Sequence, residues 1–170
     1  MPASRRLSHA IAEGDGISLI VAVDGPEAAA AAQADGAEAV FLRDRGLLDA
    51  VRGATTLPVL AHARHVSHGV DACILEPDDS IELADNVERV HHVGDEETLE
   101  DVLERFDPEL LLLAAGDADD PLQCVLDLLS DVPAGKLAIA DMGHASREAI
   151  EKLERAGVDA VLLREPRSAS

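Results

Sequence analysis

The sequence predicts an α/β fold, and within that class a minimal, helix-depleted (β/α)8 barrel, the TIM-barrel architecture. Short, continuous apolar runs alternate with amphipathic stretches, which is the pattern of a parallel sheet covered by helices. A motif of Gly, a small residue, an acidic residue, Ala and three apolar residues recurs at 36–43, 69–76 and 157–164, with a looser copy at 107–114. Repetition of one strand–helix unit around a ring is how such a barrel is built.

The apolar runs give eight expected strands, each bounded by Gly, Pro, Asp or Asn, as buried strands commonly are. They are residues 17–23, 39–42, 58–61, 72–75, 89–93, 109–115, 136–140 and 160–163. The expected helices lie at 26–35, 45–53, 79–87, 95–105, 120–130 and 146–156. The last helix is the most clearly delimited, because Ser146 is a suitable N-cap and Gly157 a suitable C-cap.

The chain is short for this fold, with 170 residues where about 250 are typical. Residues 64–70 are too few for a helix between the third and fourth strands, and nothing after Arg164 can form an eighth helix. Two stretches of the outer layer are therefore expected to be thin. An open, doubly wound sheet is the rival interpretation, but the repeat continues to the last strand and favours the barrel.

The N-terminal segment is expected to replace part of the missing layer. Leu7, Ala10 and Ile11 recur at helical spacing, so residues 3–13 are predicted to form a helix packed on the closing strand, next to the first. The expected organisation is an N-terminal helix or arm at 1–16 and a compact barrel at 17–170. A homodimer, if one forms, is expected to bury the gap beside the third and fourth strands.

The composition restricts the partners. The formal net charge is -20, from 34 acidic against 14 basic residues, and 47% of the residues are hydrophobic, so the charge lies on a folded body. Such a surface repels nucleic acid and anionic membranes, so neither is expected as a partner. No apolar run is long enough to span a bilayer and no signal peptide is evident, so a cytoplasmic location is expected.

Three segments resemble the indole-3-glycerol phosphate synthase family, whose members are phosphate-binding TIM barrels. The last two strands of that family are similar to KLAIADMGHASREAIEKLERAGVDAVLLRE at 136–165, its third strand to LLDAVRGATTLPVLAHAR at 47–64 and its fifth to HVGDEETLEDVL at 92–103. The order and register agree over most of the chain. The resemblance implies an active site at the carboxyl ends of the strands and, in the family, a lyase that performs a decarboxylating ring closure.

The residues that carry the family's chemistry are replaced in this chain. The third-strand Lys of the family falls on His62, the fifth-strand Glu on His92 and the seventh-strand Glu on Asp141. The Gly that follows the seventh strand is kept as Gly143, but the eighth-strand Gly of the phosphate cradle falls on Arg164. The resemblance therefore implies a related barrel that does not catalyse the parent reaction.

His62, His92 and Asp141 are the candidate catalytic residues, because all three fall on positions that face inward in the resembling family. Two histidines and one carboxylate also have the composition of a Zn or non-haem Fe site. These three residues and His144 are therefore candidate ligands of a divalent metal, although the sequence requires no cofactor. The alternative is that the histidines are polar lining of the barrel mouth, hydrogen-bonded to one another and to water.

Gly143, Arg164 and Arg167 are the candidate phosphate-binding residues. Arginine binds phosphate through two parallel hydrogen bonds, and the loops after the last two strands are the usual phosphate site of these barrels. The alternative is that Arg164 pairs with Glu165 or Asp141 in an otherwise anionic mouth.

Three classes of function remain open. The first is a barrel that binds a small or phosphorylated molecule at its mouth. The second is an enzyme, either a divergent lyase of the parent type or a metal-dependent enzyme that uses the histidines and Asp141. The third is a non-catalytic protein that associates with a partner through strand faces left uncovered by missing helices.

Overall fold

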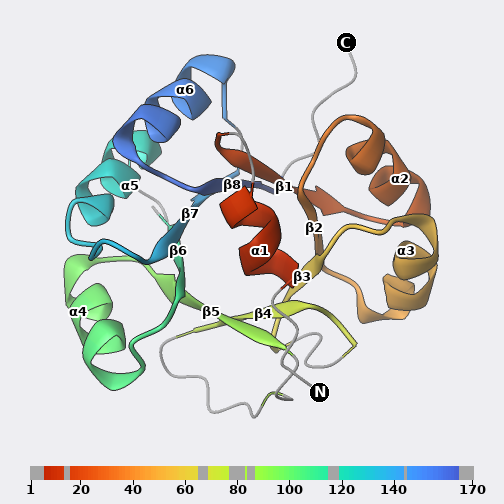
Figure 1. Cartoon of the computed structure of the whole chain (residues 1–170), viewed down its shortest axis with the longest axis horizontal. Helices are drawn as coiled ribbons and strands as arrows, with labels where there is room; N and C mark the ends of the chain where they lie inside the picture. The colour runs from red at the N-terminus through yellow and green to blue at the C-terminus, as the bar shows by residue number, and fades with distance from the viewer. Residues whose placement is uncertain are drawn as a thin grey trace.

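The chain forms a closed barrel of eight parallel strands in the order β1-β2-β3-β4-β5-β6-β7-β8, and β8 pairs with β1 (Figure 1). This computed structural model describes residues 6–13, 16–64, 69–76, 83, 87–114, 119–143 and 145–164. The strands are β1 (Ser18–Val23), β2 (Ala39–Leu42), β3 (Val59–His62), β4 (Ala72–Leu75), β5 (Glu88–Val93), β6 (Leu110–Ala114), β7 (Leu137–Met142) and β8 (Ala160–Leu163). The predicted (β/α)8 barrel is confirmed, and the open sheet is excluded.

Helices lie around the outside of the barrel (Figure 1). They are α2 (Pro26–Ala34), the 3-10 turn η1 (Arg45–Leu47) with α3 (Leu48–Ala54), α4 (Glu96–Arg105), α5 (Pro121–Leu129) and α6 (Arg147–Ala156). No helix occurs among the described residues between β3 and β4, as predicted. Of the helix expected at 79–87, Leu83 and Val87 are described and neither is helical, while the remainder lies outside the described residues. Within the described part of the chain, no helix is long and apolar enough to cross a membrane.

Capping residues fix the ends of these helices. The Ser146 Oγ accepts a hydrogen bond from the Ala149 N–H at 3.1 Å, and Gly157 ends α6 in the left-handed conformation with φ 105°. Asp95 caps α4 through the Thr98 N–H at 2.7 Å, and this hydrogen bond holds the pKa of the Asp95 carboxyl below its usual value. The helix ends therefore follow local sequence signals.

The interior of the barrel is filled by alternate residues of the strands, as the pleat requires. The inward apolar side chains are buried in one cluster: Ile20, Phe41, Leu60, Ile74, Val90, Leu112, Ile139 and Leu162. Residues two positions further along these strands face the same way. This register decides which polar residues meet at the carboxyl end.

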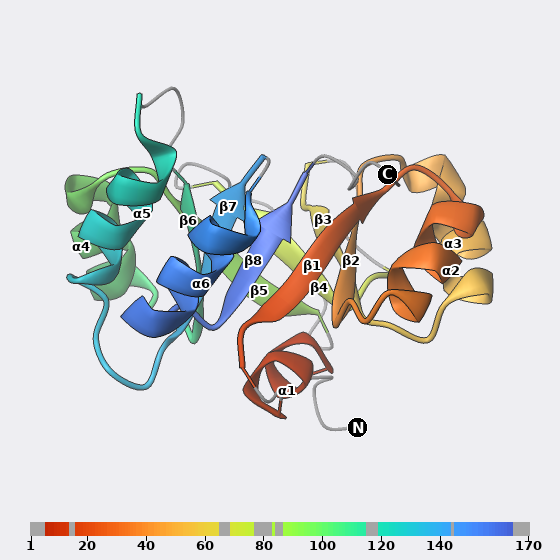
Figure 2. The same ribbon diagram turned by 90° about the horizontal axis from the view of Figure 1, so that it is seen from above.

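The N-terminal helix α1 (Arg6–Glu13) closes the amino end of the barrel (Figure 2). Leu7 and Ile11 are 0% and 3% exposed and belong to the interior cluster. The Glu88 carboxylate at the start of β5 accepts hydrogen bonds from the Leu7 and Ser8 N–H groups at 2.9 and 3.1 Å. The predicted helix is present, but its predicted place on the closing strand is wrong. Its apolar face plugs the open end, which offers more enclosed apolar surface than the outside of one strand does.

Of the two expected thin places in the outer layer, the one beside β3 and β4 is covered by described residues. The outward residues Val59, Ala61 and Cys73 of β3 and β4 are at most 1% exposed, because they pack with Val51 of α3 and with Val87. Burial also raises the pKa of the Cys73 thiol to about 12. The expected gap beside β3 and β4, which a second copy of the chain would cover, is therefore filled by described residues of the same chain.

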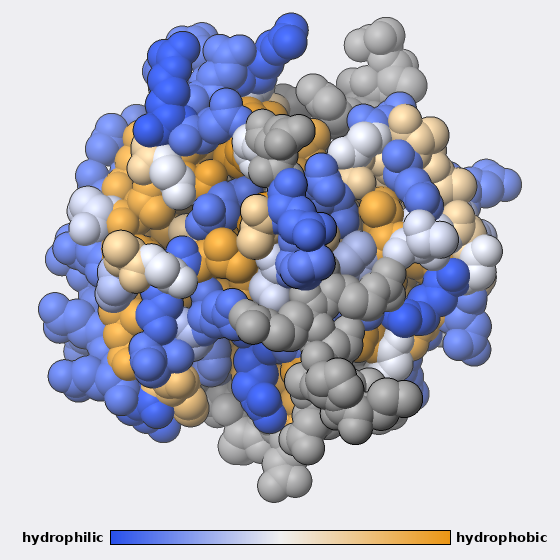
Figure 3. Space-filling model, in the orientation of Figure 1, coloured by the Kyte–Doolittle hydropathy of each residue, from blue (hydrophilic) through white to orange (hydrophobic). Residues whose placement is uncertain are grey.

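The other expected thin place lies on β1, between α2 and α6. The outward residues Leu19 and Val21 are partly exposed. Both line a hollow of about 140 Å³ towards α2, and Leu19 also lines one of about 220 Å³ towards α6. Seen from the α1 end, hydrophilic side chains are spread over the described part of the face, with hydrophobic residues showing between them (Figure 3).

The acidic residue of the repeated motif ties neighbouring strands together. The Asp71 carboxylate accepts a hydrogen bond from the Val59 N–H at 2.8 Å, and the Asp71 N–H donates to the Val59 carbonyl at 3.0 Å. Asp159 makes the same two contacts with Ala138, each at 2.9 Å. Each pair joins the residue before one strand to the beginning of the preceding strand. The repeat therefore encodes strand register as well as burial.

Candidate functional site

The polar residues of the barrel interior gather at the carboxyl ends of the strands, opposite α1. His62 and Arg164 lie two residues beyond the inward Leu60 and Leu162, and Glu76 lies two residues beyond Ile74. His92 and Asp141 follow Val90 and Ile139 in the same way. Because side chains alternate along a strand, these five residues face into the mouth above the apolar layers.

Glu76 brings the two histidines together. The Glu76 Oε2 lies 2.9 Å from the His92 Nδ1, and the Glu76 Oε1 lies 3.3 Å from the His62 Nε2. The three side chains are between 18% and 24% exposed, so solvent and a small ligand can reach them. A carboxylate that contacts one nitrogen of an imidazole fixes the orientation of the ring and its tautomer. Glu76 is not among the residues predicted to be functional; the signal that could have found it is the inward register of β4.

Asp141 binds Arg164 instead of joining the histidines. The Arg164 Nε and Nη2 donate to the two Asp141 carboxylate oxygens at 2.8 and 2.7 Å. The guanidinium also lies over the Phe41 ring, 5.2 Å from its centroid. The hydrogen bond to Asp141 raises the pKa of Arg164 above its usual value. The structure therefore confirms the alternative in which Arg164 pairs with Asp141.

The candidate metal ligands are not brought together as one group. His62 and His92 contact Glu76, Asp141 contacts Arg164, and His144 lies outside the described residues. Across the described ranges, no set of three or more His, Cys, Asp or Glu side chains is arranged to hold a metal ion.

Of the candidate phosphate-binding residues, Arg164 lines a pocket, Gly143 is exposed beyond β7 and Arg167 lies outside the described residues. A Cβ added to Gly143 would meet no atom within 4 Å, so neither crowding nor a positive φ requires glycine there.

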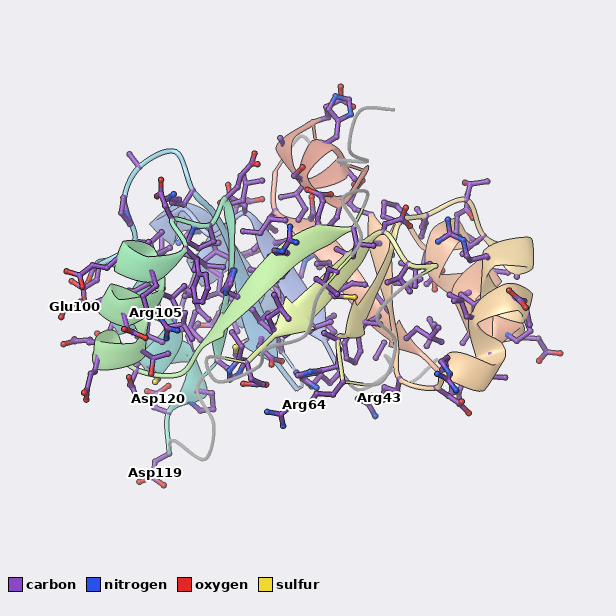
Figure 4. The ribbon with its side chains drawn as sticks, turned by 90° about the horizontal axis from the view of Figure 1, so that it is seen from below. Arg43, Arg64, Glu100, Arg105, Asp119 and Asp120 are labelled. Atoms are coloured by element: carbon purple, nitrogen blue, oxygen red, sulfur yellow. The ribbon has the colours of Figure 1, made fainter. Side chains whose placement is uncertain are left out.

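A pocket of about 270 Å³ lies beside these residues, between β1, β2, β8 and α2. Its floor is apolar and its rim carries four charged side chains; the lining is Ala22, Val23, Asp24, Ala28, Arg43, Asp44, Leu47 and Arg164. The Arg43 Nη2 donates to the Arg164 carbonyl at 2.7 Å, which ties the end of β2 to the end of β8. Figure 4 shows Arg43 and Arg64 at the end of the molecule opposite α1.

The barrel is similar to solved enzyme structures, whereas its sequence matches no protein-family model and no curated protein. Oxaloacetate acetylhydrolase superposes with a TM-score of 0.73 and 13% identity over 99% of this chain and 82% of that chain. N-acetylmannosamine-6-phosphate 2-epimerase from Clostridium perfringens superposes with a TM-score of 0.70 and 12% identity over 86% of each chain. Phosphoenolpyruvate phosphomutase from Streptomyces platensis subsp. rosaceus gives 0.68 and 16% identity over 95% of this chain and 80% of that chain. At these identities the likeness shows a shared TIM-barrel fold. No family model supports the more specific resemblance to indole-3-glycerol phosphate synthases.

Proposed function

We propose that this protein binds a small anionic metabolite, such as a phosphate ester, at the carboxyl end of its barrel. The observation that carries the proposal is the pocket in which Arg43 and Arg164 stand over an apolar floor. Arg164 is held in place by Asp141 and Phe41, and Arg43 is held by the Arg164 carbonyl. Guanidinium groups that are already oriented lose little freedom when they bind a phosphate or carboxylate.

The names of the similar structures agree with this class of ligand. They describe enzymes that act on a phosphorylated sugar, on phosphoenolpyruvate and on oxaloacetate, all of them small anions. The described residues assemble no metal site, and the proposed binding requires no cation. The predicted roles of Gly143 and Arg167 in holding the phosphate stay untested predictions.

Binding can be measured with sn-glycerol 3-phosphate as the probe, by isothermal titration of the full chain. Wild type should bind with a dissociation constant in the millimolar range or tighter, and Arg43→Gln should weaken binding about tenfold, as expected for the loss of one charge-assisted hydrogen bond. Arg155→Gln removes the same charge from an exposed position on α6 and should bind as wild type does. Equal affinity of wild type and Arg43→Gln, or no binding by wild type, would refute the proposal.

A proton-transfer enzyme is the second candidate function, and the contacts of Glu76 with His62 and His92 favour it. Two imidazoles oriented by one carboxylate can supply a general base and a general acid on one bound molecule. Such chemistry needs no lysine.

The parent synthase reaction is not expected, because no lysine can reach the mouth. The chain has two lysines. Lys136 precedes β7 at the amino end of the barrel and binds Asp107, and Lys152 lies on the outside of α6 near Glu148. Purified protein incubated with the anthranilate-derived sugar phosphate of that reaction should form no indole product above background, as followed by fluorescence. Steady turnover would show that a histidine replaces the lysine as general acid.

A further inference from the structure

The pocket at the mouth contains carboxylates as well as guanidinium groups. Asp24 follows β1, and Asp44 follows β2. The Asp44 carboxylate is used within its own loop, where it accepts a hydrogen bond from the Gly46 N–H at 2.9 Å. The Asp24 carboxylate is exposed and makes no hydrogen bond or ion pair with any of the residues that the structure describes. A carboxylate at this position repels a ligand that carries only negative charge.

Asp24 and Arg43 are neighbours in the strand register, yet they do not pair. Val23 lies opposite Leu42 in the β1–β2 ladder, so Asp24 and Arg43 occupy the next position on adjacent strands, about 4.8 Å apart across the ladder. Opposite charges at such positions ordinarily attract each other. Arg43 instead donates to the Arg164 carbonyl at 2.7 Å. Both groups therefore remain available to a ligand that touches each of them.

The charge of the pocket also favours a ligand that carries a cationic group over a simple dianion. Arg164 is neutralised by Asp141 through two hydrogen bonds, which leaves the single positive charge of Arg43 against the carboxylates of Asp24 and Asp44. A phosphate monoester adds a charge of about -1.5 to -2 near neutral pH. The whole chain carries a net charge of -20, which adds to the repulsion. An ammonium group on the same ligand would remove most of this repulsion.

We infer that the ligand of this pocket is a zwitterion, namely a small phosphorylated amine whose ammonium group binds Asp24 and whose phosphate binds Arg43. The inference rests on the proposed function, since it concerns the same pocket. The pocket, of about 270 Å³, has room for a short alkyl linker, and Ala22, Ala28 and Leu47 offer this linker an apolar floor. Figure 4 shows Arg43 at the edge of the mouth, where the phosphate of such a ligand can remain close to solvent.

Two isosteric probes test the inference. O-phosphoethanolamine and 2-hydroxyethyl phosphate have the same length and the same phosphate, and they differ in an ammonium against a hydroxyl group. Titration calorimetry of the full chain at pH 7.5 should show phosphoethanolamine binding about tenfold more tightly, a ratio that corresponds to one charged contact. Asp24→Asn should abolish this ratio and leave the affinity for 2-hydroxyethyl phosphate unchanged or improved. Arg43→Gln should weaken both probes.

The control is Asp119→Asn, which removes the same charge at the same end of the molecule but outside the pocket (Figure 4). It should keep the wild-type ratio. Equal affinities of wild type for the two probes, or a ratio that survives in Asp24→Asn, would overturn the inference while the proposed anion binding stands. Failure of both probes to bind would overturn the two together.

Discussion

At the scale of single residues, the mouth of the barrel is organised by partners that come from different strands. An ionised carboxylate can only accept hydrogen bonds. Glu76 therefore requires an N–H from each imidazole that contacts it, the Nδ1–H of His92 and the Nε2–H of His62. In a neutral ring the lone pair then lies on the opposite nitrogen, which is Nε2 in His92 and Nδ1 in His62.

Glu76→Gln should force one of these imidazoles to change its tautomer. An amide presents an acceptor on one side and a donor on the other, whereas the carboxylate presents two acceptors. The amide NH2 must therefore face a nitrogen that holds a lone pair. Long-range 1H–15N spectra should show an altered tautomer for His62 or His92 in the variant. Glu100→Gln, on the outer side of α4 (Figure 4), should leave both rings as in wild type, and unchanged tautomers in Glu76→Gln would contradict the assignment.

Several residues of the mouth can be predicted from the sequence, and the Asp141–Arg164 pair is one of its alternatives, but the contact of Glu76 with both histidines is not predicted. His62, His92 and Asp141 could be placed near the mouth because strand ends and register follow from apolar runs and a repeat. Pairing of Asp141 with Arg164, and of both histidines with Glu76, depends on how far each strand is shifted around the barrel. That shift is a property of the closed sheet as a whole, and no local pattern encodes it.

At the scale of elements, β5 and α4 enclose a histidine that makes stability depend on pH. His91 faces outward from β5, is 5% exposed and stacks on Phe106 with ring centroids 4.7 Å apart. Burial, and then the charge of Arg89, lower the pKa of His91 below the usual value of a histidine. The unfolded chain therefore binds a proton at a higher pH than the folded chain does. The free energy of unfolding should fall as the pH drops below about 6.5.

His91→Leu should reduce this loss of stability, because the variant has no imidazole to protonate at that position. Urea unfolding at pH 7.5 and at pH 5.5 measures the difference in free energy of unfolding for each protein. The difference should be smaller in His91→Leu than in wild type. His9→Gln, on the exposed side of α1, is the control and should keep the wild-type difference. An equal difference in His91→Leu and wild type would mean that other groups produce it.

The repeated acidic residue predicts a second effect at this scale. Asp71 is 4% exposed, accepts from the Val59 N–H and binds the Arg52 guanidinium at 3.2 Å. Asp71→Ala leaves that buried N–H without its acceptor and should cost about 1–3 kcal/mol of stability, measured by urea unfolding. Glu38 occupies the same place in another copy of the repeat, but its side chain makes no hydrogen bond with a described residue. Glu38→Ala should therefore cost less than Asp71→Ala, and equal costs would contradict the proposed role.

At the scale of the whole molecule, residues of the same chain cover the outer face of β3 and β4 and the amino end of the barrel. The strand bounds at 39–42, 72–75 and 160–163 were predicted to the residue, because continuous apolar runs bounded by turn residues are a strong local signal. The place of α1 could not be predicted in this way. Leu7 and Ile11 show which face of the helix is apolar, and they do not show whether an outer strand face or the open end of the barrel receives it.

Closure of the amino end by α1 should account for a measurable part of the stability of the fold. Leu7 is fully buried among the interior side chains, and truncation of a buried leucine to alanine costs about 2–5 kcal/mol. For a chain of this size, that corresponds to a fall in Tm of about 4–20 °C. Leu7→Ala should show this fall in thermal unfolding, whereas Glu13→Ala at the exposed end of the same helix should change Tm little, because surface ion pairs contribute about 0–1 kcal/mol. Deletion of residues 1–14 should destabilise the protein further, because it opens the interior layer at Ile20 and Leu162 to water. If Leu7→Ala and the truncated chain both melt with wild type, the barrel is held closed by its strands and outer helices alone.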